Sequence, residues 1–164
     1  PAVAADVGVS KALVFHYFPT QRDLQSAIAD AAASDMLAMF RSIDGEQDHA
    51  TQLRQGLELF VSFVELRPAS YATIARGAGT DPQLNAVFER SRSEIVSIIA
   101  TALGLESPSD QVRMYMRGWI ALCEETILQW IATRAVERDD LIEFLHTTAF
   151  DIIARAVVTL ERDQ

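Results

Sequence analysis

The sequence lacks the features of disulfide-linked, membrane-spanning and disordered proteins. Its single cysteine, Cys123, cannot form a disulfide within the chain, which is consistent with a reducing compartment. Its apolar runs are far shorter than the ~18 to 20 residues that cross a bilayer, and residues 1–20 contain no basic segment of a secretion signal. Glycine and proline are scarce, with 7 and 5 in 164 residues, and 49% of the residues are apolar. We therefore expect an ordered, cytoplasmic protein with no membrane partner.

The sequence also lacks a pattern of catalytic or metal-ligating residues. The three histidines lie far apart, and Cys123 has no histidine or cysteine neighbour at the spacing of a metal ligand. Glu124 and Glu125 are adjacent, but neighbouring side chains on a helix point about 100° apart, so these carboxylates do not face each other as an acid and base pair would. We predict no catalytic residue, no metal site and no cofactor, and we expect that the protein is not an enzyme.

The excess negative charge lies outside the first 24 residues. The whole chain has a net charge of −9, whereas residues 1–24 contain two acidic and two basic residues, which sum to zero. Lys11, the only lysine of the chain, lies in this neutral segment. Because an acidic surface repels nucleic acid, any contact with DNA would have to be made locally by this segment.

Helix-start and helix-stop signals predict an all-α protein. Thr20 and Asp23 form a capping box that begins one helix, and Asp81, which a proline follows, begins another. Ser107 is predicted to cap a further helix, and Pro68 either ends the helix before it or begins a short one. Strand-like alternation does not occur in the sequence. The predicted helices span about residues 20–43, 50–67, 82–103, 108–134 and 139–162.

The segment GVSKALVFHYF, which begins at Gly8, has the pattern of a helix-turn-helix. Gly8 supplies the positive φ of a tight turn, and Ser10 caps a short helix over residues 11–18. Val14 and Phe18 share the inner side of this helix, which leaves its other side free to enter the major groove of DNA. An ordinary helical hairpin within a core has the same periodicity, so the pattern by itself leaves both interpretations open.

The stretch VAADVGVSKALVFHYFPTQRDLQSAI, residues 3–28, resembles the helix-turn-helix signature of TetR-family transcriptional regulators, which runs approximately I-A-x-x-A-G-V-S-x-x-T-L-Y-x-H-F-x-S-K-x-x-L. The resemblance implies a DNA-binding module over residues 1–26 and a helical ligand-binding and dimerisation domain over residues 27–164. It also implies a homodimeric repressor that leaves double-stranded operator DNA when a small apolar or amphipathic effector binds. In the family another helix precedes this motif, so we expect the first helix of the module to be missing here.

The resemblance further implies which side chains touch DNA. The start of the recognition helix would contact base edges, and its end, together with the start of the next helix, would contact phosphates. Phe15 stands where the family usually has tyrosine, so an apolar contact replaces a hydroxyl, and Gln21 stands where a phosphate-binding lysine is usual. The predicted DNA-contacting residues are Ser10, Lys11, Ala12, Leu13, Phe15, His16, Tyr17, Gln21 and Arg22.

The last two predicted helices are apolar on more than one side. A surface helix needs only one apolar stripe, so a second surface must cover them, and in a chain of this size we expect a partner subunit. This resembles the TetR family, in which the last two helices pair with their copies. The predicted dimer-interface residues are Leu128, Ile131, Leu141, Leu145, Ile152 and Ile153. The alternative is a monomeric bundle whose own core takes up both stripes.

Methionine and aromatic side chains of the middle helices, together with the family resemblance, predict an apolar cavity for the effector, with Tyr71 or Glu124 as its polar contact. The predicted lining residues are Met36, Met39, Phe40, Phe60, Phe63, Tyr71, Phe88, Met116, Trp119, Cys123 and Glu124. The same pattern is typical of an ordinary core. The alternative function is therefore an all-helical carrier or protein-interaction module that does not read DNA.

Overall fold

The computed structural model describes residues 16–105 and 107–162, and their regular structure is entirely helical. This confirms the predicted all-α class. The predicted helix boundaries are close to the observed ones, and Pro68 begins a separate short helix. The helices are α3 (Gln21–Arg41), α4 (His49–Leu66), α5 (Pro68–Ala78), α6 (Pro82–Ala102), α7 (Asp110–Thr133) and α8 (Arg138–Arg162). The predicted helix-turn-helix before residue 16 lies outside the described residues.

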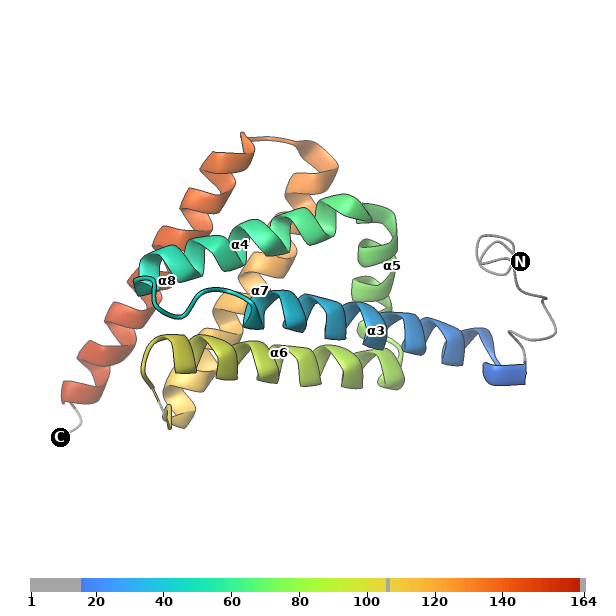
Figure 1. The fold of residues 1–164 in the computed structure, drawn as a ribbon, viewed down its shortest axis with the longest axis horizontal. Helices are drawn as coiled ribbons and strands as arrows, with labels where there is room; N and C mark the ends of the chain where they lie inside the picture. Colours follow the sequence, from blue (N-terminus) through green and yellow to red (C-terminus); the bar gives the residue numbers. More distant parts are fainter. Residues whose placement is uncertain (1–15, 106, 163–164) are drawn as a thin grey trace.

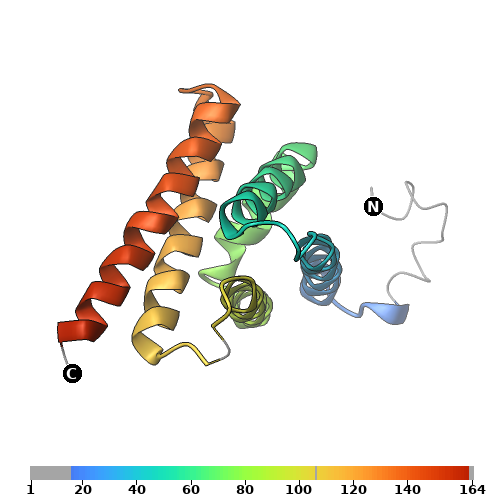
Figure 2. The same ribbon diagram turned by 60° about the vertical axis from the view of Figure 1, so that its left-hand side comes forward.

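The helices form two packed groups that share α4 and α6. Helices α3 and α6 lie side by side along much of their length, and α5 closes the end of this group near the start of α6 (Figure 1). Helices α7 and α8 form a long pair on the other side of the molecule, and α4 packs against both of them (Figure 2). The start of α3, which follows the predicted DNA-contacting segment, therefore lies far from the α7–α8 pair.

Short polar signals in the sequence set where the helices begin. The Thr20 hydroxyl accepts a hydrogen bond from the Asp23 amide at 3.1 Å, and the Asp23 carboxylate accepts one from the Thr20 amide at 3.0 Å, which confirms the capping box. Asp81 caps α6 by accepting from the amide of Gln83 at 2.8 Å. The prediction of Ser107 as the cap of α7 is wrong by two residues.

The cap of α7 is Ser109, whose hydroxyl accepts a hydrogen bond from the Val112 amide at 3.3 Å. Ser109 has the extended backbone of a cap residue, with φ −61° and ψ 161°, and Asp110 then supplies the negative charge that favours the first turn of a helix. The sequence offers a serine at both positions, and the backbone geometry selects the second.

The main core lies where α4 meets α7 and α8. Its fully buried side chains are Val61, Val64, Ile127, Ile142 and Leu145. The indole of Trp119 also donates a hydrogen bond from Nε1 to the Leu145 carbonyl oxygen at 3.1 Å. This buried hydrogen bond joins α7 to α8 within their apolar interface.

The turn between α7 and α8 is fixed by Trp130. Its Nε1 donates to the Val136 carbonyl oxygen at 2.8 Å, and the Arg134 guanidinium lies 3.9 Å from the centre of one of its rings. Arg134 ends α7 in the left-handed conformation, with φ 48°. A non-glycine residue in this conformation is strained, and the stacking on Trp130 offsets part of that cost.

Helix α3 is attached to α6 by a much smaller apolar cluster. Ala29 of α3 packs with Leu84 and Val87 of α6. Around this cluster the two helices are joined by the ion pairs Arg22–Asp81, Arg90–Asp30 and Arg41–Glu94. Because exposed ion pairs contribute only about 0 to 1 kcal/mol each, α3 is held less firmly than the helices of the main core.

In the described part of the chain, none of the helices is both long and apolar enough to cross a bilayer.

Substitution of Leu145 by alanine will test the position of the core. Leu145 is 0% exposed, so we expect Leu145→Ala to lower the free energy of unfolding by about 2 to 5 kcal/mol in a urea titration followed by circular dichroism. Leu66→Ala is the matched control, because Leu66 is 76% exposed and the same substitution there should change the stability by less than about 0.5 kcal/mol. Equal effects of the two substitutions would contradict this assignment of the core.

Candidate ligand cavity and DNA-contacting segment

A cavity of about 740 Å³ lies between the two groups of helices. Its walls come from the end of α3, the first half of α4, the second half of α6, the first part of α7, and α8 as far as Ile152. A volume of this size is within the range of about 300 to 1,000 Å³ that is typical of small-molecule sites. The cavity is therefore large enough to hold a drug-sized molecule.

The structure brings most of the residues predicted for the ligand site to this cavity. Those that line it are Met36, Phe40, Phe60, Met116, Trp119, Cys123 and Glu124. Those that are not part of its lining are Met39, Phe63, Tyr71 and Phe88. Contact between a ligand and any of them stays a prediction.

Three of the residues outside the lining form an aromatic cluster behind the cavity wall. The ring of Tyr71 lies 6.0 Å from that of Phe60, 6.3 Å from that of Phe63 and 6.5 Å from that of Phe88. Edge-to-face and tilted contacts of this kind bring the rings against one another. Phe63, Tyr71 and Phe88 are thus packing residues, and the prediction of Tyr71 as a polar contact for the ligand is not supported by its position.

Much of the cavity wall is formed by aliphatic side chains that the sequence prediction omitted. A residue that faces a cavity has the same helical periodicity as one that faces a solid core, so no sequence signal separates the two. The omitted apolar residues include Ile43, Leu53, Ile95, Ile98, Ile99, Leu103, Leu105, Val112, Tyr115, Phe150 and Ile152.

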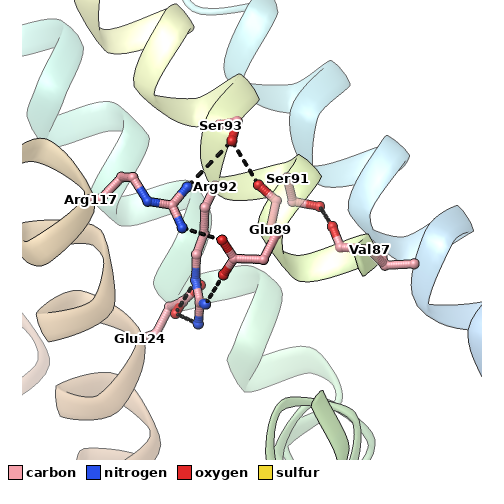
Figure 3. Close-up of polar contacts among 7 residues, drawn as sticks. All are labelled: Val87, Glu89, Ser91, Arg92, Ser93, Arg117 and Glu124. Carbon is pink, nitrogen blue, oxygen red and sulfur yellow. Dashed lines mark hydrogen bonds and ion pairs between the residues drawn. The ribbon is translucent and has the colours of Figure 1, made fainter. Parts of the chain in front are cut away.

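A network of four charged side chains joins α6 to α7 beside the cavity (Figure 3). Arg92 donates to Glu124 from Nε at 3.0 Å and from Nη2 at 2.5 Å, and to Glu89 from Nη1 at 2.9 Å. Arg117 of α7 pairs with the other oxygen of Glu89. Burial raises the pKa of the Glu89 carboxyl, but the hydrogen bonds from Arg92 and Arg117 outweigh it and hold this pKa below its usual value. Hydrogen bonding to Glu124 raises the pKa of Arg92.

Two neutral groups next to this network resist ionisation. Burial, followed by the negative charge of Glu124, raises the pKa of the Cys123 thiol well above its ordinary value. The same two causes, in the same order, raise the pKa of the Tyr71 phenol, and Arg92 opposes them. Cys123 is therefore a neutral part of the cavity wall at physiological pH.

Four of the residues predicted to contact DNA lie within the described residues, and all four are exposed: His16, Tyr17, Gln21 and Arg22. The remaining ones, Ser10, Lys11, Ala12, Leu13 and Phe15, lie outside the described residues. The rings of His16 and Tyr17 meet edge to face at 5.3 Å. Arg22 pairs through Nε with Asp81, so the same carboxylate caps α6 and holds a side chain that is predicted to contact phosphate.

The structure corrects the prediction for the dimer interface at two positions. Leu141 and Leu145 are 3% and 0% exposed within a single chain, so they belong to its own core and do not reach a partner. Ile131 and Ile152 also pack against this core, and Ile152 lines the cavity. Leu128 is half-buried. The side chain of Ile153 is outside what the structure describes.

Two large apolar side chains of α7 and α8 are exposed instead. Met114 is 59% exposed and Phe144 is 54% exposed. Phe144 points away from the α4 side of α8, because its neighbour Glu143 pairs with Arg54 of α4 and lies about 100° away around the helix. The sequence pattern placed Phe144 off the main apolar stripe, and this signal could have identified it.

The described residues form an all-α bundle with a cavity of about 740 Å³ beside the end of α3. Residues 49–152 match the family model described as the Tetracyclin repressor-like C-terminal domain. This match spans more than half of the chain. The chain belongs to the TetR family of transcriptional regulators, which are DNA-binding regulators of transcription and not enzymes.

Solved structures of TetR-family regulators have the same fold. A tetR-family transcriptional regulator from Streptomyces coelicolor is similar over 96% of this chain and 71% of its own, with a TM-score of 0.85 and 24% sequence identity. A TetR transcriptional regulator from Rhodococcus sp. RHA1 is similar over 92% and 81%, with a TM-score of 0.68 and 19% identity. The TetR-like regulator LfrR from Mycobacterium smegmatis, solved in complex with proflavine, is similar over 90% and 80%, with a TM-score of 0.58 and 22% identity.

The sequence of the chain matches none of the curated proteins.

The burial of Cys123 predicts how stability changes at alkaline pH. Above its ordinary pKa of 9.0 the thiol ionises in the unfolded chain but stays protonated in the folded one, so the folded state binds more protons. We therefore expect the free energy of unfolding to fall as the pH rises above about 9, by up to about 1.4 kcal/mol per pH unit from this group. Urea titrations at several pH values will measure the fall. A Cys123→Ala variant should show a shallower one, and an identical slope in that variant would contradict the prediction.

Proposed function

We infer that the protein is a homodimeric repressor that acts in the cytoplasm and leaves its operator when a small, mostly apolar or amphipathic molecule enters the cavity. The observation that favours this function is the position of α3. Its end lines the cavity through Met36 and Phe40, and its start, at Gln21 and Arg22, continues the segment predicted to contact DNA. One helix therefore links the two sites.

The energetics of α3 support its role as the moving part. Its packing against α6 consists of a small cluster and ion pairs, and it adds one buried side chain, Met36, to the main core, whereas the fully buried side chains of that core come from α4, α7 and α8. A ligand that pushes on Met36 and Phe40 would move α3 before it deforms the core. In a dimer this movement changes the separation of the two recognition helices from the ~34 to 36 Å that matches one turn of DNA.

Lys11 and Arg22 would have different roles in DNA binding. Lys11 is placed to read a base edge, which gives sequence preference, and Arg22 is placed to contact phosphate, which gives affinity. The proflavine complex of the Mycobacterium smegmatis neighbour supports ligand binding by this fold, although the likeness to that protein is one of fold alone.

DNA binding can be measured by fluorescence anisotropy of the natural full-length protein with DNA that flanks its own coding sequence, and with a scrambled duplex. We expect Lys11→Ala to abolish the preference for the native duplex. We expect Arg22→Ala to lower the slope of log affinity against log salt by about one. Arg54→Ala on α4 is the control, because Arg54 pairs with α8 and should leave both quantities unchanged. Equal, weak binding of both duplexes by the unaltered protein would instead favour the helical carrier.

Dimer formation is proposed to use the outward side of the α7–α8 pair, where Met114 and Phe144 are exposed. A charge placed in the middle of an apolar interface must be desolvated without a partner. We therefore expect Phe144→Glu to convert the dimer to a monomer at micromolar concentration in sedimentation velocity. Leu66→Glu, on an exposed position at the end of α4, should leave the dimer intact. A dimer that survives Phe144→Glu would exclude this face as the interface.

A further inference from the structure

The cavity wall is largely apolar, and its few charged side chains already have partners. Among the described residues that line it, the guanidinium and carboxylate side chains are those of Arg41, Glu94 and Glu124, and the imidazole of His49 also lines it. Arg41 and Glu94 pair with each other. Glu124 pairs with Arg92, which is not part of the lining. The charge of Glu124 is thus neutralised by a guanidinium that does not itself line the cavity.

Arg92 occupies both oxygens of the Glu124 carboxylate. Its Nε lies 3.2 Å from Oε1 and 3.0 Å from Oε2, and its Nη2 lies 2.5 Å from Oε2. The Arg92 and Glu124 side chains are only 25% and 13% exposed, so water screens this pair weakly. A guanidinium that meets a carboxylate through two nitrogens is among the strongest ion-pair geometries in proteins.

Arg92 is itself held on its other sides. Its Nη1 donates to Glu89 at 2.9 Å, and its guanidinium carbon lies 5.6 Å from the centre of the Phe88 ring. Glu89 in turn pairs with Arg117, so the network of Figure 3 contains two positive and two negative groups and has no net charge. Neither a cation nor an anion in the cavity would find an unbalanced charge there.

On the basis of the ligand-sensing function inferred above, we propose that the cavity takes neutral, mostly apolar small molecules and that Arg92 determines this specificity by neutralising Glu124. A cationic ligand must displace the guanidinium from Glu124 or remain unpaired in an apolar wall, and either event costs free energy. An anionic ligand meets the same network, in which both arginines are already satisfied.

Three small molecules with the same alkyl chain and different heads will test the charge preference. Decanol is neutral, decyltrimethylammonium is a cation and decanoate is an anion, and each can displace the neutral fluorescent probe N-phenyl-1-naphthylamine from the full-length dimer. Because the heads differ in their own hydration, the informative quantity is the change in each affinity, relative to that of decanol, when a residue is substituted.

Arg92→Gln keeps a hydrogen-bond donor beside Glu124 but removes the positive charge. We expect it to raise the affinity for decyltrimethylammonium, relative to that for decanol, by about tenfold, which corresponds to about 1.4 kcal/mol. Glu124→Gln should have the reciprocal effect and raise the relative affinity for decanoate. In the double variant both gains should disappear, because neither charge remains.

Arg90→Gln is the matched control, because Arg90 lies on the same helix and pairs with Asp30 on the exposed α3 side. It should leave the affinities for decyltrimethylammonium and decanoate, relative to that for decanol, unchanged, because any change in how firmly α3 is held acts on all three molecules alike. Unaltered relative affinities in both single variants, with folding verified by circular dichroism, would overturn the charge specificity but leave ligand sensing standing. Failure of the probe and of all three molecules to bind the unaltered protein would overturn ligand sensing itself.

Discussion

The packing of α4 against the α7–α8 pair is the interaction on which the rest of the structure depends. Val61 and Val64 from α4 meet Ile127 of α7 and Leu145 of α8, and all four are completely or almost completely removed from water. Burial of such side chains contributes roughly 1.5 to 3 kcal/mol each, far more than any of the surface ion pairs. Because Trp119 also fixes α7 to α8 by a hydrogen bond, this group has one arrangement and serves as a frame.

The cavity exists because this frame is rigid and its neighbours are not packed tightly onto it. In a bundle without a cavity, side chains would occupy this volume of about 740 Å³. The side chains that line the cavity therefore lack van der Waals contacts that they would make in a closed core. The fully buried side chains of the frame come from α4, α7 and α8, and α3 adds the buried side chain of Met36 to the same core. The cluster around Ala29 holds the rest of α3 against α6. In the proposed function, a bound ligand would replace the missing contacts by filling the space between α3 and the frame.

The sequence predicted the helix caps, which depend on neighbouring residues, better than the contacts between helices that are distant in the sequence. Capping at Thr20 and Asp81 depends on neighbours within a few residues, so it was readable from the chain. Whether an apolar residue faces a core, a cavity or a partner depends on helices far away in the sequence. Leu145 and Phe144 are adjacent and both apolar, yet one is buried and the other exposed, and the periodicity of a single helix did not decide between a core and an interface. The pairing of Glu124 with Arg92, 32 residues apart, was equally invisible.

The distribution of charge over residues 25–164, the helical body of the protein, affects how the proposed repressor would bind DNA. Arg54, Arg90, Arg92, Arg117 and Arg138 pair with carboxylates of their own chain, so they add little to an attraction for phosphate. With a net charge of −9, the body repels DNA at distances beyond the contact surface, and salt screens this repulsion. In the proposed function, added salt would have two opposing effects, because it would weaken the phosphate contacts proposed for Arg22 and also relieve the repulsion by the body. The affinity of the proposed repressor would then come from close contacts of the N-terminal segment, which is also the segment proposed to read the DNA sequence.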